Sequence, residues 1–236
     1  MSKGTERLRG HETPEPFPFK AIIYDLDGLL VDSEELWFET FASVLSRYGI
    51  TLEEEQRVFL LGRGNMSSFL IERFGIKEEP SVLRQKIWET FSEQAEKGLK
   101  PLPGAVDSVK RLSPYLRLAV ASSAHTDYVE MAVLQLGIRD FFQVLVGGDQ
   151  VARAKPQPEV FLRASELLEV RPEQCLVLED SLSGVEAAKA ANMFCIAVPN
   201  RFLVNSDFSR ADLLIPTLEH LDFSTLQKLA ESKKPL

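Results

Sequence analysis

The fold of this chain is decided by residues 21–28, which read Ala21-Ile22-Ile23-Tyr24-Asp25-Leu26-Asp27-Gly28. Four consecutive apolar residues are typical of a buried strand, and Gly28 allows a tight reversal of the backbone after it. Asp25 and Asp27 are therefore expected just beyond the carboxyl end of a strand. Ligands bind at this edge in open α/β sheets, so the pair is a candidate functional site. The alternative is an ordinary polar corner between a strand and a loop.

Strands and helices are predicted to alternate from residue 101 onwards. Helical patterns separate five short apolar runs, which predict strands at 116–121, 144–146, 175–178, 194–198 and 213–215. Such alternation indicates right-handed βαβ crossovers and a parallel sheet with helices on both faces. We therefore predict an α/β fold with a Rossmann-like parallel sheet in a three-layer α/β/α core.

A block of helical periodicity interrupts this pattern directly after the first strand. Its apolar stripes run through Trp37–Tyr48, Met66–Phe74 and Leu83–Ala95, and Pro101-Leu102-Pro103-Gly104 ends it. Residues 1–18 are polar and rich in proline and glycine. These features predict a flexible arm at 1–18, a core domain built from 19–33 and 101–236, and an inserted all-α cap domain at 34–100.

Composition narrows the classes of partner. The 236 residues are 44% hydrophobic with a net charge of -8, and no basic stripe is present, which argues against nucleic acid and anionic membranes as partners. The only cysteines, Cys175 and Cys195, lie in apolar runs and are expected to be reduced core residues of a cytoplasmic protein. No apolar run is long enough to span a membrane. A monomer or weak dimer is expected.

Three further polar clusters follow predicted strands or their loops. Ser122-Ser123 could donate to phosphoryl oxygens, or Ser122 could cap a helix. Lys155 precedes Pro156, which favours an extended backbone at the lysine; the alternative is a solvated surface lysine. Glu179-Asp180-Ser181 could bring carboxylates to the same edge, or Asp180 or Ser181 could cap the next helix.

A parallel sheet would bring these clusters together with Asp25 and Asp27. Several carboxylates at close range require either raised pKa values or a nearby cation. Because the available ligands are oxygens, without histidine or cysteine, Mg²⁺ is favoured over Zn²⁺. A calcium-binding EF-hand loop is excluded, because counting from Asp25 places Leu30 and Leu36 where that loop needs glycine and glutamate.

The ordered motifs resemble those of the haloacid dehalogenase superfamily of phosphotransferases. The resemblance extends from about Phe19 to Leu229, and its four motifs are Asp25-Leu26-Asp27-Gly28 with Asp32-Ser33, Ser122, Lys155-Pro156 and Glu179-Asp180-Ser181. The helical insertion is similar to the small cap of the subfamily that contains β-phosphoglucomutase and sugar-phosphate phosphatases.

This resemblance implies a two-step phosphoryl transfer. Asp25 would be the nucleophile, and Asp27 would protonate the leaving alcohol and then deprotonate water. Mg²⁺ would be held by the Asp25 carboxylate, the Asp27 backbone carbonyl and Asp180, with Glu179 supporting the site. Ser122, Ser123 and Lys155 would bind the phosphoryl group. These roles predict that the environments of Asp25 and Asp27 separate their pKa values.

The cap is expected to select the substrate. Trp37 stands where the β-phosphoglucomutase pattern has a histidine, and His125-Thr126 replaces its Lys-Asn pair, so hydrolysis of a small phosphate monoester is favoured over isomerisation. Trp37 and Arg63 are candidate substrate-binding residues; the alternatives are a cap-core tryptophan and a solvated arginine, while His125 is interpreted as a structural or rim residue. A mutase and a non-catalytic sensor of phosphorylated metabolites are the competing hypotheses.

Overall fold

Six parallel strands form the central sheet of the computed structural model, which describes residues 18–60, 66–201 and 203–232. The strand order is β3-β2-β1-β4-β5-β6, so β1 lies inside the sheet between β2 and β4. The strands are β1 (Ala21–Tyr24), β2 (Arg117–Ala121), β3 (Val144–Val146), β4 (Cys175–Glu179), β5 (Phe194–Ala197) and β6 (Leu213–Leu214). The predicted α/β fold is confirmed, and all six predicted strands are present.

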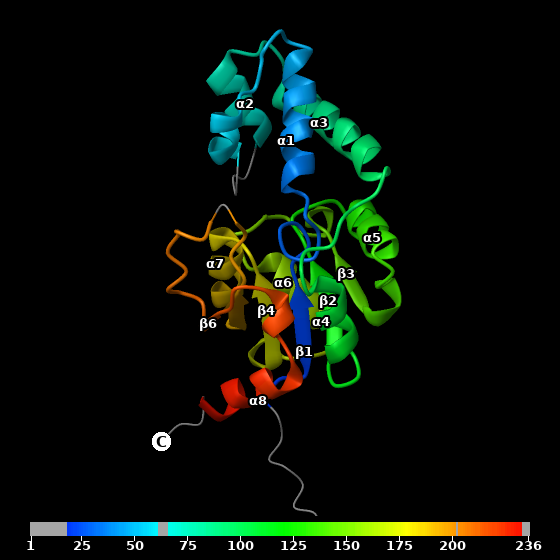
Figure 1. The fold of residues 1–236 in the computed structure, drawn as a ribbon, viewed down its shortest axis with the longest axis vertical. Helices are drawn as coiled ribbons and strands as arrows, with labels where there is room; N and C mark the ends of the chain where they lie inside the picture. Colours follow the sequence, from blue (N-terminus) through cyan, green and yellow to red (C-terminus); the bar gives the residue numbers. More distant parts are fainter. Residues whose placement is uncertain (1–17, 61–65, 202, 233–236) are drawn as a thin grey trace, which may run out of the picture.

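Alternation along the strands builds two hydrophobic layers. In β1, Ile22 and Tyr24 belong to one apolar cluster, whereas Ala21 and Ile23 belong to the other. The first cluster is covered by α4 (Ala105–Leu112), α5 (Thr126–Gln135) and α8 (Phe223–Ser232). The second is covered by α6 (Glu159–Leu167) and α7 (Leu182–Ala190). Helices on both faces leave the edge at the strand ends as the place where polar side chains can gather (Figure 1).

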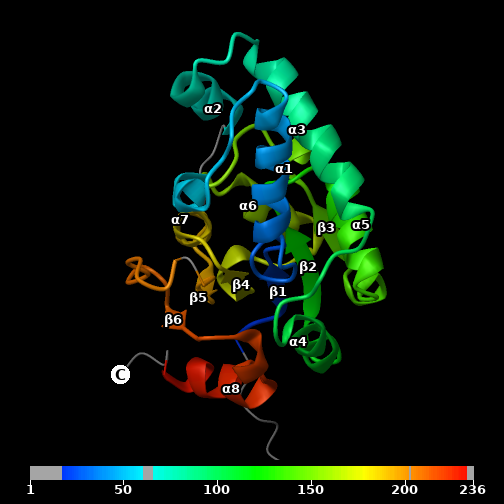
Figure 2. The same ribbon diagram turned by 45° about the horizontal axis from the view of Figure 1, so that its top comes forward.

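The inserted segment is helical and has an apolar core of its own. It contains α1 (Glu34–Ser46), η1 (Glu54–Leu60), α2 (Met66–Phe74) and α3 (Pro80–Ala95). Leu45, Leu70 and Leu83 lie at the centre of this core. Figures 1 and 2 both show these helices beyond the carboxyl ends of the strands, with α1 rising from the end of β1. This arrangement fits the predicted helical cap.

Two adjacent linkers join the cap to the core. Asp32 N–H donates to the Lys100 carbonyl at 2.8 Å, and Leu102 N–H donates to the Leu30 carbonyl at 3.2 Å. The outgoing and returning chains therefore run side by side. The exact domain boundaries at 33/34 and 100/101 stay a prediction, and residues 1–17 of the predicted arm lie outside the described residues.

Two helices of the core were absent from the expectations, namely α4 and α8. Both follow turn signals and are ten residues long or shorter, so their periodicity spans few turns. The short 3₁₀ turns at Arg139–Phe141, Gly148–Gln150, Pro172–Gln174 and Leu218–His220 complete the described elements. Among the described residues, no helix is both long and apolar enough to cross a membrane.

Candidate active site

Asp25 lies at the carboxyl end of β1, in the interior of the sheet. Its backbone N–H donates to the Leu178 carbonyl at 3.0 Å, which continues the ladder between β1 and β4. The residue is only 6% exposed. Burial, opposed by Lys155 and supported by the Glu179 charge, raises the pKa of Asp25 to about 8. Burial thus opposes the ionised form of Asp25, and positive charge close to the carboxylate favours it.

Lys155 bridges the carboxylates of Asp25 and Glu179. Its Nζ lies 2.5 Å from Asp25 Oδ1 and 2.5 Å from Glu179 Oε1, and it also donates to the Ala121 carbonyl at 3.2 Å. The side chain is 5% exposed, so the alternative of a solvated surface lysine is wrong. Burial lowers the pKa of Lys155, but the two carboxylates outweigh burial and raise it overall. The ammonium thus remains charged.

Several hydrogen-bond donors hold the Glu179 carboxylate in place. Its Oε2 accepts from the backbone N–H of Asp180 at 3.0 Å, the N–H of Ser181 at 3.1 Å and the Ser181 hydroxyl at 2.9 Å. A Cβ at position 184 would lie 1.8 Å from Glu179 Cδ, so only Gly184 lets α7 begin against this carboxylate. Ser181 also caps α7 by accepting from Gly184 N–H, which confirms the capping alternative for that residue.

Three carboxylates converge closely enough to hold a cation. Oxygens of Asp25, Glu179 and Asp180 lie within 4.8 Å of one another, and all three residues are buried. Burial, supported by the charges of Glu179 and Asp25, raises the pKa of Asp180 well above its ordinary value. Since only oxygens are offered and Glu179 is already engaged, Asp25 and Asp180 are the pair best suited to a hard divalent cation.

Gly28 shapes the same site from the loop after β1. Its φ of +78° is unfavourable for other residues. A Cβ there would also lie 2.1 Å from Asp180 Oδ2, the oxygen that accepts from Asn200 Nδ2 at 2.8 Å. The glycine therefore serves both the turn and the close approach to a candidate cation ligand.

Among the described residues, the Asp27 carboxyl is not part of this group of three, although its charge acts on Asp25. Its Oδ1 accepts from the Tyr128 hydroxyl at 2.9 Å. Burial raises the pKa of Asp27, and the hydrogen bond from Tyr128 lowers it without outweighing burial. The pKa values of Asp25 and Asp27 are thus both raised, so burial alone does not make Asp25 the ionised member of the pair.

The remaining predicted site residues have different surroundings. Ser122 is buried at the end of β2 and accepts from Ala124 N–H at 3.0 Å. His125 caps α5, so the alternative that Ser122 caps this helix is wrong. Ser123 is exposed. Trp37 is half-buried and stacks on Phe91 with 3.7 Å between ring centroids. Arg63 lies outside the described residues.

Tyr128 and Asn200 were missed by the sequence analysis. Tyr128 lies on the buried side of α5 beside Val129, so its position in the pattern indicates only a core residue. Asn200 follows β5 and could have been found by extending the strand-end rule to that strand. Both side chains contact a predicted site residue.

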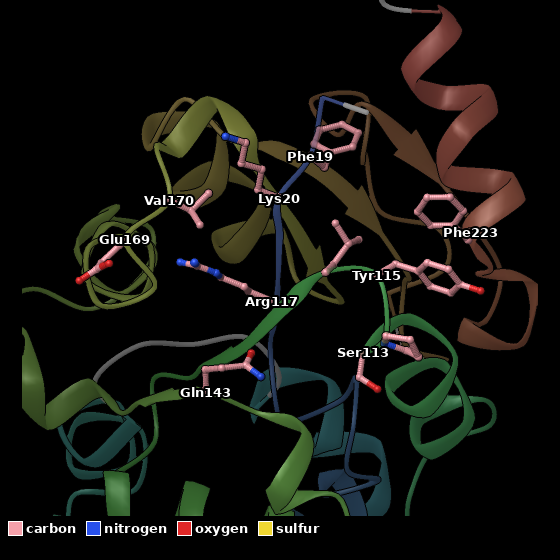
Figure 3. A pocket seen from close by; sticks show the side chains of 11 residues that line it. Phe19, Lys20, Ser113, Tyr115, Arg117, Gln143, Glu169, Val170 and Phe223 are labelled. Carbon is pink, nitrogen blue, oxygen red and sulfur yellow. The ribbon is translucent and has the colours of Figure 1, made fainter. Parts of the chain in front are cut away.

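The larger of the two described cavities lies at the opposite edge of the sheet. It measures about 660 Å³ and is lined by residues that include Lys20, Arg117, Tyr115 and Phe223. Figure 3 shows Lys20 and Arg117, at the amino ends of β1 and β2, with Tyr115 beside Phe223. A smaller cavity of about 390 Å³ borders Gly28 and Asn200 next to the carboxylates. The candidate active site is therefore not at the larger cavity.

Comparison with known proteins agrees with this geometry. Residues 22–198 match the family described as haloacid dehalogenase-like hydrolase. A phosphorylated carbohydrates phosphatase from Thermotoga maritima is 34% identical over 177 residues, covering 74% of this chain and 82% of the relative. Fructose-1-phosphate phosphatase YqaB from Escherichia coli is 29% identical, covering 76% and 96%.

A solved structure is similar over most of its length. The crystal structure of CbbY from Rhodobacter sphaeroides in complex with phosphate has a TM-score of 0.79 and 28% identity, covering 89% of this chain and 99% of that one. Because the family match covers most of the chain, the protein belongs to the haloacid dehalogenase-like hydrolases.

Proposed function

We propose that the protein is a Mg²⁺-dependent phosphatase that hydrolyses a small phosphorylated sugar or polyol through an aspartyl phosphate on Asp25. As a member of a hydrolase family related to phosphatases, it is a phosphoric monoester hydrolase. One observation carries the mechanism: a buried Asp25 lies between Lys155 and a second carboxylate suited to a cation. Such a nucleophile is useless while protonated and becomes effective when positive charge ionises it.

In the first step, an Asp25 oxygen forms a bond to phosphorus as the bond between phosphorus and the alcohol oxygen breaks. Asp27 gives its proton to that oxygen. In the second step, water attacks phosphorus, Asp27 takes a proton from the water, and Asp25 is released with inorganic phosphate. The raised pKa of Asp27 supports this acid role, because it favours the protonated form that the first step needs.

The other core residues bind and orient the phosphoryl group. Lys155 neutralises Asp25 and the transferred group, and Ser122 with Ser123 donates to phosphoryl oxygens. Glu179 holds both the Lys155 ammonium and the backbone of Asp180 in place. Asp25, Asp180 and the Asp27 carbonyl would hold Mg²⁺, which would supply positive charge that favours the ionised form of Asp25 and screens the phosphate dianion.

The cap supplies substrate contacts from Trp37 and Arg63 in this proposal. The printed activities of two relatives, on phosphorylated carbohydrates and on fructose 1-phosphate, support a sugar phosphate as the substrate class. Two buried free thiols, Cys175 and Cys195, are compatible with action in a reducing cytoplasm. The partner is a small molecule, with no nucleic acid or membrane, and the protein acts as a monomer or weak dimer.

The test measures phosphate release from sugar phosphates, fructose 1-phosphate among them, with Mg²⁺ or with EDTA. Asp25→Asn is expected to lower kcat by about 10⁴-fold or more, since the nucleophile is lost. Asp107→Asn, an exposed carboxylate on α4, is the control and should retain full activity. Retained hydrolysis by Asp25→Asn contradicts the mechanism. Conversion of β-glucose 1-phosphate to glucose 6-phosphate without phosphate release supports the mutase alternative instead.

A further inference from the structure

The Tyr128 hydroxyl makes a direct contact with Asp27 that the proposed reaction has not yet used. It donates to Asp27 Oδ1 at 2.9 Å. Tyr128 is 2% exposed and lies in the first turns of α5. That end of the helix is tied down, because Asp149 Oδ1 accepts from both the backbone N–H and the hydroxyl of Thr126 at 2.7 Å. The hydroxyl is therefore presented to Asp27 from a fixed element of the core.

Aromatic side chains of the cap hold the Tyr128 ring. Phe91 of α3 packs against it edge to face, with centroids 4.9 Å apart and planes at 76°. Trp88, one helical turn earlier, makes a second such contact at 6.0 Å and 87°. Trp37 of α1 stacks on Phe91, with 3.7 Å between the ring centroids. The ring position thus depends on both core and cap.

We propose that Tyr128 is a positioning residue that orients the Asp27 carboxyl for proton transfer; this rests on the proposed phosphatase function. Oδ1 is occupied as the acceptor for Tyr128, so Oδ2 carries the proton. When the bond between phosphorus and the alcohol oxygen breaks, the Oδ2–H bond breaks and a new O–H bond forms on the alcohol. The electron pair remains on Oδ2, and Tyr128 keeps its own proton throughout.

A purely structural role for Tyr128 makes a different prediction. The ring fills space in the core and contacts two cap residues, so a structural tyrosine acts through its ring. Tyr128→Phe retains the ring and removes only the hydroxyl. It therefore separates packing against the cap from orientation of Asp27.

The experiment compares two substrates that differ in their need for an acid. A sugar alkoxide requires a proton as it leaves, whereas p-nitrophenolate does not. For each substrate kcat/KM reports only the steps up to formation of the aspartyl phosphate. Tyr128→Phe is expected to lower kcat/KM for the sugar phosphate by about 10–100-fold, a part of the ~10²–10⁴-fold that general acid catalysis supplies. For p-nitrophenyl phosphate, kcat/KM should change by no more than about threefold, because p-nitrophenolate leaves without being protonated by the general acid.

Tyr48→Phe is the matched control, because it removes another hydroxyl that donates to a carboxylate, Glu78, within the cap. It should leave both substrates unaffected. Equal losses for the two substrates in Tyr128→Phe, or no loss for either, overturn the positioning role. A wild-type protein that hydrolyses neither substrate overturns the phosphatase proposal instead, so the two failures are distinguishable.

Discussion

Charged side chains at the carboxyl ends and at the amino ends of the strands are neutralised in different ways. At the carboxyl edge, Lys155 is 5% exposed and lies 2.5 Å from two carboxylates. At the amino edge, Arg117 is exposed and donates to the Leu168 carbonyl, where α6 ends. The second arrangement is an ordinary helix-end contact. The amino end of the strands has the larger cavity, yet among the described residues buried charge gathers at the carboxyl end. Charge therefore identifies the site better than volume does.

The largest effect on this contrast is expected from Lys155→Met. The substitution leaves Asp25 and Glu179 buried without their shared ammonium. Breaking such a pair typically destabilises a protein by about 3–5 kcal/mol. Urea unfolding in EDTA should show this loss, and phosphatase activity should fall with it. Lys20→Met, at the exposed amino edge, should change stability by less than about 0.5 kcal/mol; similar losses in both variants would remove the contrast.

A smaller effect is expected from Gly28→Ala. The positive φ alone makes alanine unfavourable by about 1–2 kcal/mol. The added Cβ also collides with Asp180 Oδ2, so the affinity for the divalent cation should fall. Gly49→Ala is a matched control, because Gly49 has a φ of +72° but no atom within 4 Å of the added Cβ. Calorimetric titration with Mg²⁺ should find weakened binding only in Gly28→Ala; equal affinities would show that the close approach to Asp180 is unimportant.

The pH dependence of the ion-free protein tests the buried charge directly. Because the pKa of Asp25 is raised to about 8 and that of Asp180 is raised too, the folded state binds protons more tightly than the unfolded state. The contribution of these two carboxyls to stability should therefore be fully present below about pH 4 and be lost as pH rises towards 8. Mg²⁺ at tenfold its Kd should restore about 1.4 kcal/mol at pH 8 and less at pH 5, where protons compete with it.

Thermal melts with EDTA or Mg²⁺ at both pH values measure this effect. Asp180→Asn removes a carboxyl group whose pKa is raised. The variant should therefore show a weaker pH dependence of its melting temperature and a smaller increase in melting temperature with Mg²⁺. A stability that increases with pH between 5 and 8 in EDTA would be incompatible with these carboxyl environments.

The smallest effect is expected from Arg117→Ala. It removes the hydrogen bond to the Leu168 carbonyl, worth about 1 kcal/mol. Because the contact lies at the edge opposite Asp25, kcat/KM should remain unchanged. A lower kcat/KM in a folded variant would show that the amino ends of the strands influence the active site. The contrast between the two ends of the strands would then be wrong.

Much of the core was predictable because its strands are short apolar runs bounded by turns. The strand-end rule brought Asp25, Glu179 and Asp180 together, since parallel strands share one edge. It could not predict that the Asp27 carboxyl turns towards Tyr128, because this depends on the loop after β1 and on the rotation of α5. Nor could the pattern reveal that burial raises the pKa of both aspartates, because that shift depends on the surrounding packing.

The paired linkers have an evolutionary consequence. Asp32 and Lys100 are hydrogen-bonded at 2.8 Å, so the chain leaves the core and returns to it at nearly the same point. A segment anchored in this way can be lengthened, shortened or exchanged without stretching the strands beneath it, and loop-closure entropy changes only slowly with segment length. The length and sequence of the cap can therefore change while the strands beneath it, and the carboxylates at their ends, keep their positions.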